Sequence, residues 1–180
     1  MNEKEKEAVV LRYGHRIVRD ARVTTHCCLV ARAFGAKKII ICGDQDNELK
    51  ERIEKLNREW GGEFAVCFSE SWRKTVTEHK EKGFFIVHNT MYGQPIQKKE
   101  KEIKKHKKIL VVIGSQKVEK EVYEKADMNI SVTSQPHSEI AALALTLDRI
   151  FEGKELEKKF SNEKKKIIPS KKGKIIKSKE

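Results

Sequence analysis

The chain has 180 residues and carries 39 lysines and arginines against 27 aspartates and glutamates, a formal net charge of +12. This length suits one domain with a sizeable core, which excludes a small disulfide-framed module and makes a multidomain protein unexpected. The basic excess favours a polyanionic partner, above all a nucleic acid, although a charge-rich surface that serves only solubility or thermal stability would have the same composition.

Cysteine and histidine spacing gives no sign of a metal site or of a disulfide framework. No two cysteines have Cys-x-x-Cys spacing, and the histidines show no ligand spacing. We therefore expect free, buried thiols in a reducing cytosol. No apolar run is long enough to cross a membrane, and the charged beginning of the chain does not resemble a signal peptide. These features predict a cytoplasmic protein without a metal or a membrane partner.

Short apolar runs that end at small or polar residues alternate with helix-like stretches along the chain. The expected strands are residues 8–13, 38–42, 64–68, 84–88, 109–113 and 128–132, and the expected helices are residues 22–34, 46–60, 71–81, 98–107, 117–125 and 138–151. The strands are continuous apolar runs, which is typical of a sheet covered on both faces. The alternation predicts an α/β fold with a mainly parallel sheet. Trp60, Trp72 and Tyr92 occupy apolar positions, so we expect core packing rather than stacking on bases.

Arginines are concentrated where the first strand meets the first helix. They are Arg12, Arg16, Arg19, Arg22 and Arg32. Arg16, Arg19 and Arg22 are three residues apart, so they would project on one side of a loop and first helical turn. A guanidinium fork suits phosphate oxygens. The residues alone leave two interpretations open, RNA contact or a solvated basic face paired with Asp20.

Two later segments are apolar strands that stop abruptly at small polar residues, as strands do when they deliver a turn to a ligand site. The first turn contains Gly114, Ser115, Gln116, Lys117 and Val118; the second contains Val132, Thr133, Ser134, Gln135, Pro136, His137, Ser138 and Glu139. Gly114 would let backbone approach a ligand without a Cβ in the way. Ser138 suits a helix N-cap, with Glu139 complementing the helix dipole. No Gly-x-Gly-x-x-Gly or Walker sequence is present, so the commonest nucleotide loops are excluded.

The expected helix at residues 138–151 is apolar on more than one side in its first half. One side can cover the sheet, and the other could meet a second subunit. We therefore expect a homodimer through this helix, around Leu143 and Leu147.

Residues 154–180 are lysine-rich, with 11 lysines against 4 acidic residues. We expect this extension to add RNA affinity without taking part in chemistry. Its two Ile-Ile pairs, at residues 167–168 and 175–176, could each form a short edge strand, or the segment could be disordered. The expected division is a domain at residues 1–153 and an extension at residues 154–180.

Four blocks of sequence, taken in order, resemble archaeal tRNA cytidine 2'-O-methyltransferases, which belong to the SPOUT class of knotted enzymes. The first block contains Gly14-His15-Arg16, Arg19-Asp20 and Arg22-Val23-Thr24-Thr25-His26, then Ala31-Arg32-Ala33-Phe34-Gly35-Ala36. The later blocks are Thr90-Met91-Tyr92-Gly93; Gly114-Ser115-Gln116-Lys117-Val118 with Glu121-Val122-Tyr123; and Gln135-Pro136-His137-Ser138-Glu139 with Ala141-Ala142-Leu143-Ala144-Leu145. The resemblance extends from about Leu11 to Gly153.

This resemblance implies the SPOUT α/β fold, with a deep trefoil knot formed by the C-terminal segment. It implies methyl transfer from S-adenosyl-L-methionine to the ribose 2'-hydroxyl of a cytidine in the T loop of tRNA, at position 56. The two turns described above, together with Asn89, would hold the cofactor. Arg22 would be the residue nearest the chemistry, fixed at the start of its helix, with Arg19 in a looser loop as the alternative and as a phosphate anchor.

Asn89, Ser115 and Gln116 differ from the residues that this family resemblance leads us to expect. Two alternatives therefore stay open. One is a non-catalytic RNA-binding protein of the same fold, and the other is a 2'-O-methyltransferase acting on another RNA.

Overall fold

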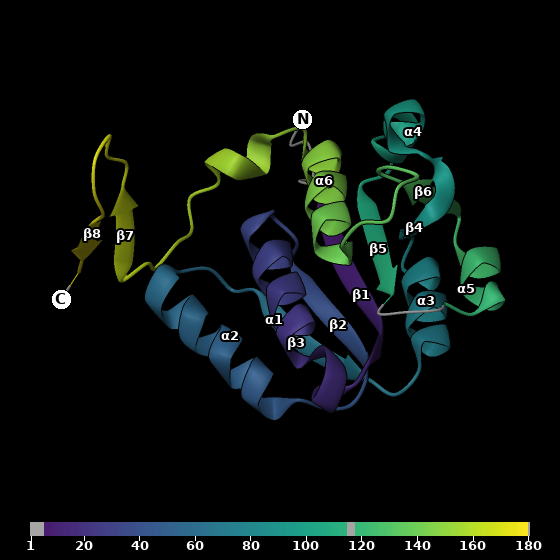
Figure 1. Ribbon diagram of the computed structural model, residues 1–180, viewed down its shortest axis with the longest axis horizontal. Coiled ribbons are helices and arrows are strands. Elements are labelled where there is room, and N and C mark those ends of the chain that lie inside the picture. Colours follow the sequence, from purple (N-terminus) through teal and green to yellow (C-terminus); the bar gives the residue numbers. More distant parts are fainter. Residues whose placement is uncertain (1–5, 115–117, 180) are drawn as a thin grey trace.

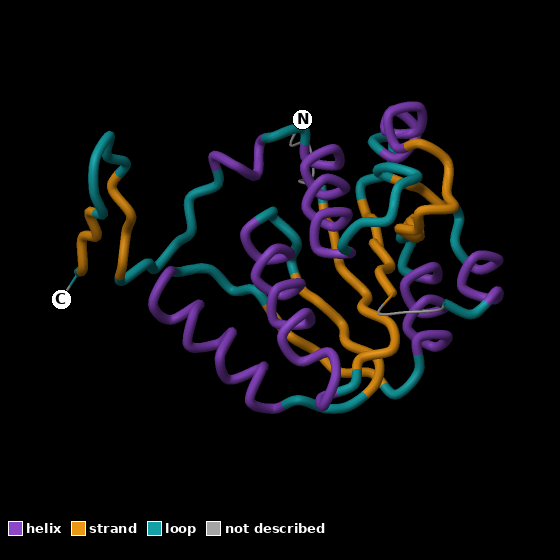
Figure 2. The backbone as a smooth tube through the Cα atoms, viewed as in Figure 1, coloured by secondary structure: helices purple, strands orange, loops and turns teal. Residues whose placement is uncertain are grey.

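The main sheet of the computed structural model has the strand order β3-β2-β1-β5-β4-β6, and the structure describes residues 6–114 and 118–179 of the chain. The strands are β1 (Glu7–His15), β2 (Lys38–Gly43), β3 (Ala65–Ser69), β4 (Phe85–Pro95), β5 (Lys108–Gly114) and β6 (Met128–Ser131). Every pairing between them is parallel (Figures 1 and 2). The expected α/β fold with a mainly parallel sheet is confirmed, and only β4 runs well beyond its predicted end.

Helices cover both faces of this sheet, as the continuous apolar strands predict. They are α1 (Ile17–Ala33), α2 (Asn47–Trp60), α3 (Trp72–Glu81), α4 (Ile96–Ile103), α5 (Lys120–Lys125) and α6 (Glu139–Phe151). Buried residues of α1, α2, α4 and α6 form one apolar cluster with the sheet, and those of α3 and α5 form the other. Trp72 lies in the second cluster and is 5% exposed, so its predicted core packing is confirmed.

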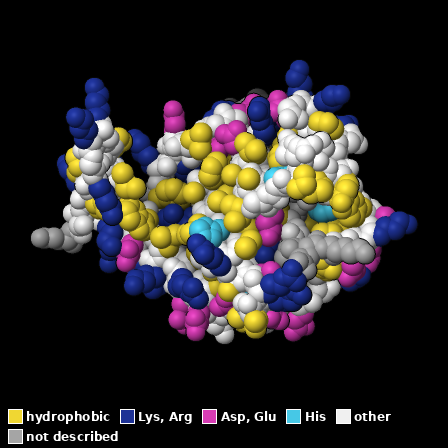
Figure 3. Space-filling model, in the orientation of Figure 1, with side chains coloured by type: hydrophobic (Ala, Val, Ile, Leu, Met, Phe, Trp, Pro, Cys, Tyr) yellow, Lys and Arg dark blue, Asp and Glu magenta, His cyan; other side chains and the backbone are white. Residues whose placement is uncertain are grey.

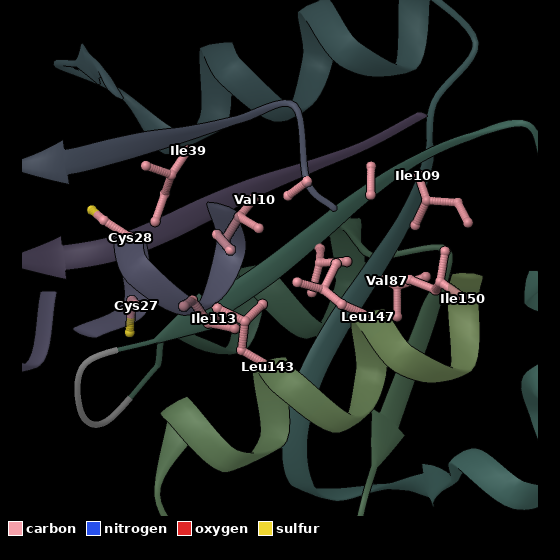
Figure 4. Packing of buried hydrophobic residues seen from close by; sticks show 14 of the residues in the cluster. Val10, Cys27, Cys28, Ile39, Val87, Ile109, Ile113, Leu143, Leu147 and Ile150 are labelled. Carbon is pink, nitrogen blue, oxygen red and sulfur yellow. The ribbon is translucent and has the colours of Figure 1, made fainter. Parts of the chain in front are cut away.

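Leu143 and Leu147 of α6 point into the core, against Val10 of β1 and Ile113 of β5 (Figure 4). Both leucines have 0% exposure within a single chain. The expectation that they form a subunit interface is therefore wrong, because the covered side of α6 is the side that carries them. Leu145, which is 49% exposed, lies on the other side of this helix.

Helix α1 begins at Ile17, five residues before its predicted start. Two carboxylates satisfy the first backbone donors: Asp44 Oδ2 accepts from the Ile17 N–H at 2.9 Å, and Asp20 Oδ2 accepts from the Arg16 N–H at 3.2 Å. Arg19 therefore belongs to the helix and not to a loose loop. The missed signal is Asp44, which comes from the segment after β2.

All four cysteines are free, and Cys27, Cys28 and Cys42 are buried while Cys67 is half-buried. Burial raises the pKa of the Cys27 and Cys28 thiols to about 12. The expectation of free thiols is confirmed for the cysteines, all of which lie in the described residues.

The C-terminal extension first follows the domain surface and then leaves it. After a short 3-10 helix, η1 (Lys154–Glu157), the Gly62 N–H donates to the Ser161 carbonyl at 2.9 Å, and the Arg32 guanidinium lies 4.5 Å from the Phe160 ring centre. The two Ile-Ile pairs then form β7 (Lys165–Ile168) and β8 (Ile175–Ser178), an antiparallel hairpin with a sheet of its own. The pairs are thus strands, but they do not extend the main sheet (Figure 1).

Candidate active site at the carboxyl edge of the sheet

The segments singled out in the sequence converge at one edge of the main sheet. The carboxyl ends of β1 and β5 are in register at Tyr13 and Gly114. On the other side of β5, β4 becomes irregular between Asn89 and Gln94, beside the end of β6 at Ser131. Ligand sites of open parallel sheets lie at this edge, outside the ends of the strands.

The irregular segment of β4 at residues 89–94 packs directly on the backbone of β6. A Cβ at Gly93 would lie 2.4–2.6 Å from backbone atoms of Ile130, so only glycine fits there. Ser131 Oγ donates to the Gly93 carbonyl at 3.2 Å, and Thr146 Oγ1 of α6 donates to Asn89 Oδ1 at 3.2 Å. The Asn89 Nδ2 group is buried and has no hydrogen-bond partner in the described part of the chain. A donor without a partner at this edge is available to a ligand.

The turn between β6 and α6 is open to solvent over residues 133–136. The Gln135 N–H donates to Thr133 Oγ1 at 3.2 Å, and the His137 ring contacts the Gln135 carbonyl at 2.6 Å. Ser138 caps α6 as predicted, since its Oγ accepts from the Ile140 N–H at 3.2 Å. Val132 instead packs on the apolar cluster beneath, so it anchors the turn.

A partly buried chain of polar contacts lies next to the same edge. His88 Nδ1 donates to Asn129 Oδ1 at 2.8 Å, and Asn129 Nδ2 donates to the Tyr123 carbonyl at 3.0 Å. The Tyr123 hydroxyl meets Thr90 Oγ1 at 3.0 Å. Burial lowers the pKa of His88 and so favours the neutral ring. This chain of contacts joins α5, which follows the Gly114 turn, to β4 and β6.

A second buried network joins β1, α1 and α6. Arg12 Nε donates to Thr24 Oγ1 at 2.7 Å, and Arg12 Nη1 pairs with Glu139 Oε2 at 2.6 Å. His15 Nδ1 lies 2.8 Å from the same Thr24 hydroxyl. Arg12 has 0% exposure, so it is not part of a solvated basic face. An arginine inside an otherwise apolar strand was the sequence signal for this ion pair, and it was missed, as were His15 and Thr24.

Arg19 and Arg22 lie on the exposed side of the first two turns of α1, which begins at this edge of the sheet. Neither arginine has an ion-pair partner within the described residues. Arg16 at the N-cap is paired with Asp20 at 3.5 Å. Arg22 is two residues from Thr24 and therefore within one turn of the buried network that holds Glu139. Both arginines are free to meet a phosphate or a reacting oxygen.

The structure thus brings to one edge most of the residues predicted as a site. These are Arg19, Arg22, Asn89, Gly114, Val118, Val132, Thr133, Ser134, Gln135, Pro136, His137, Ser138 and Glu139. Ser115, Gln116 and Lys117 lie outside the described residues. Val118 packs on the apolar cluster of the sheet face opposite α1. The neutral donors and acceptors of this edge suit an adenosine-type cofactor better than a polyphosphate.

Tyr92 was expected in the core, but it is 81% exposed. It lies in the segment of β4 where the pairing with β6 shifts register, between Asn89 and Gln94. The expectation is wrong because the strand pattern ends at Asn89, and alternation beyond that residue no longer describes burial.

In the described part of the chain, no group of three or more histidine, cysteine, aspartate or glutamate side chains could hold a metal ion. No helix there is long and apolar enough to cross a membrane.

Comparison with protein families gives one match over a large part of the chain. The model of the family described as tRNA ribose 2'-O-methyltransferase, aTrm56, matches residues 60–177. A tRNA (cytidine(56)-2'-O)-methyltransferase of Nitrosopumilus maritimus is 51% identical over 171 residues, which cover 95% of this chain and 96% of the relative. The enzyme of the same name from Thermococcus kodakarensis is 49% identical over 175 residues, covering 95% of this chain and 97% of the relative.

Among solved structures, this chain is similar to the SpoU methyltransferase AviRb from Streptomyces viridochromogenes in complex with AdoMet. The TM-score is 0.59 at 12% sequence identity, and the match covers 84% of this chain. This chain spans 59% of the length of that enzyme, so the likeness concerns the shared fold.

Proposed function

The chain belongs to the family of tRNA (cytidine(56)-2'-O)-methyltransferases, and from this premise we propose how its residues transfer a methyl group to the ribose 2'-hydroxyl of cytidine 56 in tRNA. The observation that supports the mechanism is the shared edge: the ends of β5 and β6 lie there together with the start of α1, which carries the exposed arginines. An enzyme of this kind must align a hydroxyl with a methyl donor and help the hydroxyl lose its proton.

S-adenosyl-L-methionine is the cofactor, and when bound it supplies an electrophilic methyl group on a sulfonium. Asn89, Gly114 and the turn at residues 133–136 would hold it. The unpartnered Asn89 Nδ2 supports this assignment, since it offers a donor to adenosine or ribose acceptors. Gly114 supports it as well, because no Cβ limits the approach at the end of β5. Ser115, Gln116, Lys117, Val118, Val132, His137 and Ser138 complete the proposed set. Glu139 would hold the end of this turn in place through its ion pair with Arg12 and would not itself touch the cofactor.

Arg22 is the proposed catalytic residue, and Arg19 is the proposed phosphate anchor. A guanidinium does not give up its proton in proteins, so Arg22 does not act as the base. It instead stabilises the negative charge that develops on the 2'-oxygen and grips the neighbouring phosphate. The proton leaves to the phosphate or to water. Both residues are held by the same helix, so their difference is position along α1 and not rigidity.

Mass spectrometry of nuclease-digested tRNA tests this function directly. The enzyme is incubated with labelled cofactor and an unmodified tRNA transcript, and we expect label only in the 2'-O-methylcytidine from position 56. A transcript with 2'-deoxycytidine at that position should accept no label. Label on a base or on another nucleotide would contradict the assignment, and cofactor binding without any transfer would favour a non-catalytic RNA-binding protein.

We further propose that two chains form a homodimer through the exposed apolar surface of α1 and α6. This surface includes Val18, Leu29 and Leu145, which are 102%, 36% and 49% exposed, and hydrophobic side chains gather over these helices in Figure 3. Helices α1 and α6 lie side by side, so the surface is continuous. Exposed apolar area of this kind is typical of an interface between subunits.

Replacing Leu145 with glutamate should therefore convert the dimer to monomers. In a symmetric dimer the new glutamate would be buried once in each subunit, and the two negative charges would repel each other across the symmetry axis. Light scattering at micromolar concentration measures the mass. Leu156→Glu is the matched control, since Leu156 is a 64% exposed leucine of η1, beyond the end of α6 and outside both helices. A wild-type monomer, or dissociation by the control alone, would contradict the proposed interface.

We propose that residues 1–153 are the methyltransferase domain and that the extension at residues 154–180 adds nonspecific affinity for tRNA. Residues 160–164 contact α1 and α2, which supports a fixed attachment for the hairpin. Lys171, Lys172 and Lys174 are exposed at the tip of the hairpin between β7 and β8. They are well placed to reach a polyanion.

Changing these three lysines together to glutamine should weaken tRNA binding and flatten its salt dependence. Each lost phosphate contact removes about 0.9 units from the slope of log affinity against log salt. Turnover at saturating tRNA should stay unchanged. The triple lysine-to-arginine variant keeps the charge and should keep the slope. An unchanged slope in the glutamine variant would show that the tip does not touch the RNA.

A deep trefoil knot at the C-terminal segment and a cytoplasmic location are also part of this proposal. The knot is supported by the path of the chain, which runs from edge strand β6 back across the sheet to pack α6 on α1. A crystal structure in which residues 128–151 lie clear of the loop at residues 89–114 would contradict the knot. The buried free thiols support a reducing compartment.

A further inference from the structure

We propose that Arg12 is a positioning residue for methyl transfer: its buried guanidinium fixes helix α1, which carries Arg19 and Arg22, against the start of helix α6, where the cofactor turn ends. The inference rests on the proposed function, because it concerns the alignment of that reaction.

Arg12 lies on the face of β1 that α1 and α6 cover. Side chains alternate along a strand, and Ala8 and Val10, which have the same parity, belong to the apolar cluster on that face. The guanidinium therefore extends between the two helices. The Arg12 backbone pairs with Ile113, one residue before the end of β5 at Gly114. Arg12 thus lies where the first motif meets the end of β5, beside the proposed cofactor site.

Its contacts reach one residue on each helix. The 2.7 Å bond to Thr24 holds α1 two residues after Arg22. The 2.6 Å ion pair with Glu139 holds the first turn of α6, directly after the cap residue Ser138. These partners are 12 and 127 residues away along the chain, so a single side chain joins distant segments.

Stability alone does not account for a charged pair in this place. Two buried ions lose their hydration, and apolar side chains of similar volume are often equally or more stabilising. Burial raises the pKa of Glu139, and the positive charge of Arg12 opposes that shift, so the carboxylate depends on its partner. Arg12 Nη2 and His15 Nε2 are buried without a hydrogen-bond partner in the described residues, which is a further cost.

Alignment of the reacting atoms offers a reason for the Arg12–Glu139 pair that stability does not. Methyl transfer needs the 2'-oxygen, the methyl carbon and the sulfur in line. A misplacement of about 1 Å can cost about 100-fold in rate. If Arg12 sets the distance between Arg22 and the cofactor turn, its loss should slow the reaction while both ligands still bind.

The test is the double variant Arg12→Met with Glu139→Leu, which removes both charges and leaves neither buried alone. We expect near wild-type thermal stability, and affinities for S-adenosyl-L-methionine and tRNA that stay within about threefold. The single-turnover rate at saturation should fall about 10- to 100-fold. Cofactor stoichiometry by calorimetry corrects the rate for any inactive protein. A wild-type rate in this folded variant would overturn the proposal.

Arg32→Met is the matched control. Arg32 is also a buried arginine, 8% exposed, and it donates to Asn57 and to the Gly61 carbonyl at the other end of α1 from the site. It should lower stability without changing the rate per folded molecule. Equal rate losses in both variants would assign the effect to general destabilisation and overturn the proposal.

Glu139→Gln provides a second reading if the double variant does not fold. It keeps an oxygen acceptor for Arg12 at the same size but leaves the buried Arg12 charge without a counter-charge, so thermal stability should fall. The rate per folded molecule, counted by cofactor stoichiometry, should fall by a smaller factor than in the double variant. A wild-type rate there would overturn the role of the ion pair. Wild-type enzyme measured alongside separates the two proposals: absent methyl transfer by wild type contradicts the function, whereas active wild type with unimpaired variants contradicts only the role of Arg12.

Discussion

Replacing Arg22 with lysine is expected to slow methyl transfer at least about 100-fold, which is the range for loss of one preorganised oxyanion donor. Lysine keeps the positive charge but presents a compact ammonium in place of a planar fork. It can attract the phosphate and cannot hold both the phosphate and the developing 2'-oxyanion in fixed geometry. Binding of tRNA and of cofactor should therefore change little. Single-turnover assays at saturation, with separate binding measurements, separate the two effects.

Arg19→Lys is the matched variant on the same exposed side of α1. As a phosphate anchor, Arg19 should contribute to tRNA affinity, so its replacement is expected to raise the tRNA dissociation constant and spare the saturated rate. The opposite pattern, with Arg22→Lys fully active and Arg19→Lys slow, would exchange the two roles.

Replacing Gly93 with alanine is expected to abolish cofactor binding and to destabilise the fold. The added Cβ would lie 2.4–2.6 Å from backbone atoms of Ile130, and neither β4 nor β6 can yield without moving the other. Overpacking of this kind costs about 1–3 kcal/mol of unfolding free energy. Residues 89–94 and the turn after β6 both contribute to the proposed cofactor site. Moving them apart would therefore disrupt the arrangement of the residues that bind the cofactor. Urea titration and calorimetry with S-adenosyl-L-methionine measure the two effects.

Gly83→Ala is the control for backbone strain without a clash. Gly83 has a φ of +77°, and a Cβ added there would have no heavy atom within 4 Å beyond its chain neighbours. Alanine at this position should cost about 1 kcal/mol for the left-handed conformation and leave the cofactor affinity unchanged. Wild-type stability and affinity in Gly93→Ala would show that the segment at residues 89–94 is not packed on β6 as described.

The sequence predicted the parts of this fold that depend on local patterns. The apolar run of β5 and the cap at Ser138 follow from neighbours in the chain, and both appear as expected. The start of α1 did not, because one of its caps is Asp44, 27 residues away from the donor at Ile17. The ion pair of Arg12 could not be predicted for the same reason, because its partner Glu139 is distant in sequence.

Helix α6 shows a different limit of sequence reasoning. Its first half is apolar on more than one side, so periodicity could not distinguish the buried Leu143 and Leu147 from the exposed Leu145. Likewise, both Arg19 and Arg22 had the chemistry expected of a catalytic residue. Because α1 begins before its predicted start, both arginines lie on one helix. They therefore differ in position along α1 and not in rigidity.

The buried thiols of α1 can report how often this helix separates from the sheet. Burial raises the pKa of the Cys27 and Cys28 thiols to about 12, so at neutral pH they stay protonated, and the thiolate is the reactive form. An alkylating reagent in excess should first modify the half-buried Cys67. It can then reach α1 only when that helix separates from the sheet. The rate at which Cys27 and Cys28 are modified therefore measures how often α1, which carries Arg19 and Arg22, detaches from the sheet. Ligands that bind to α1 should lower this rate.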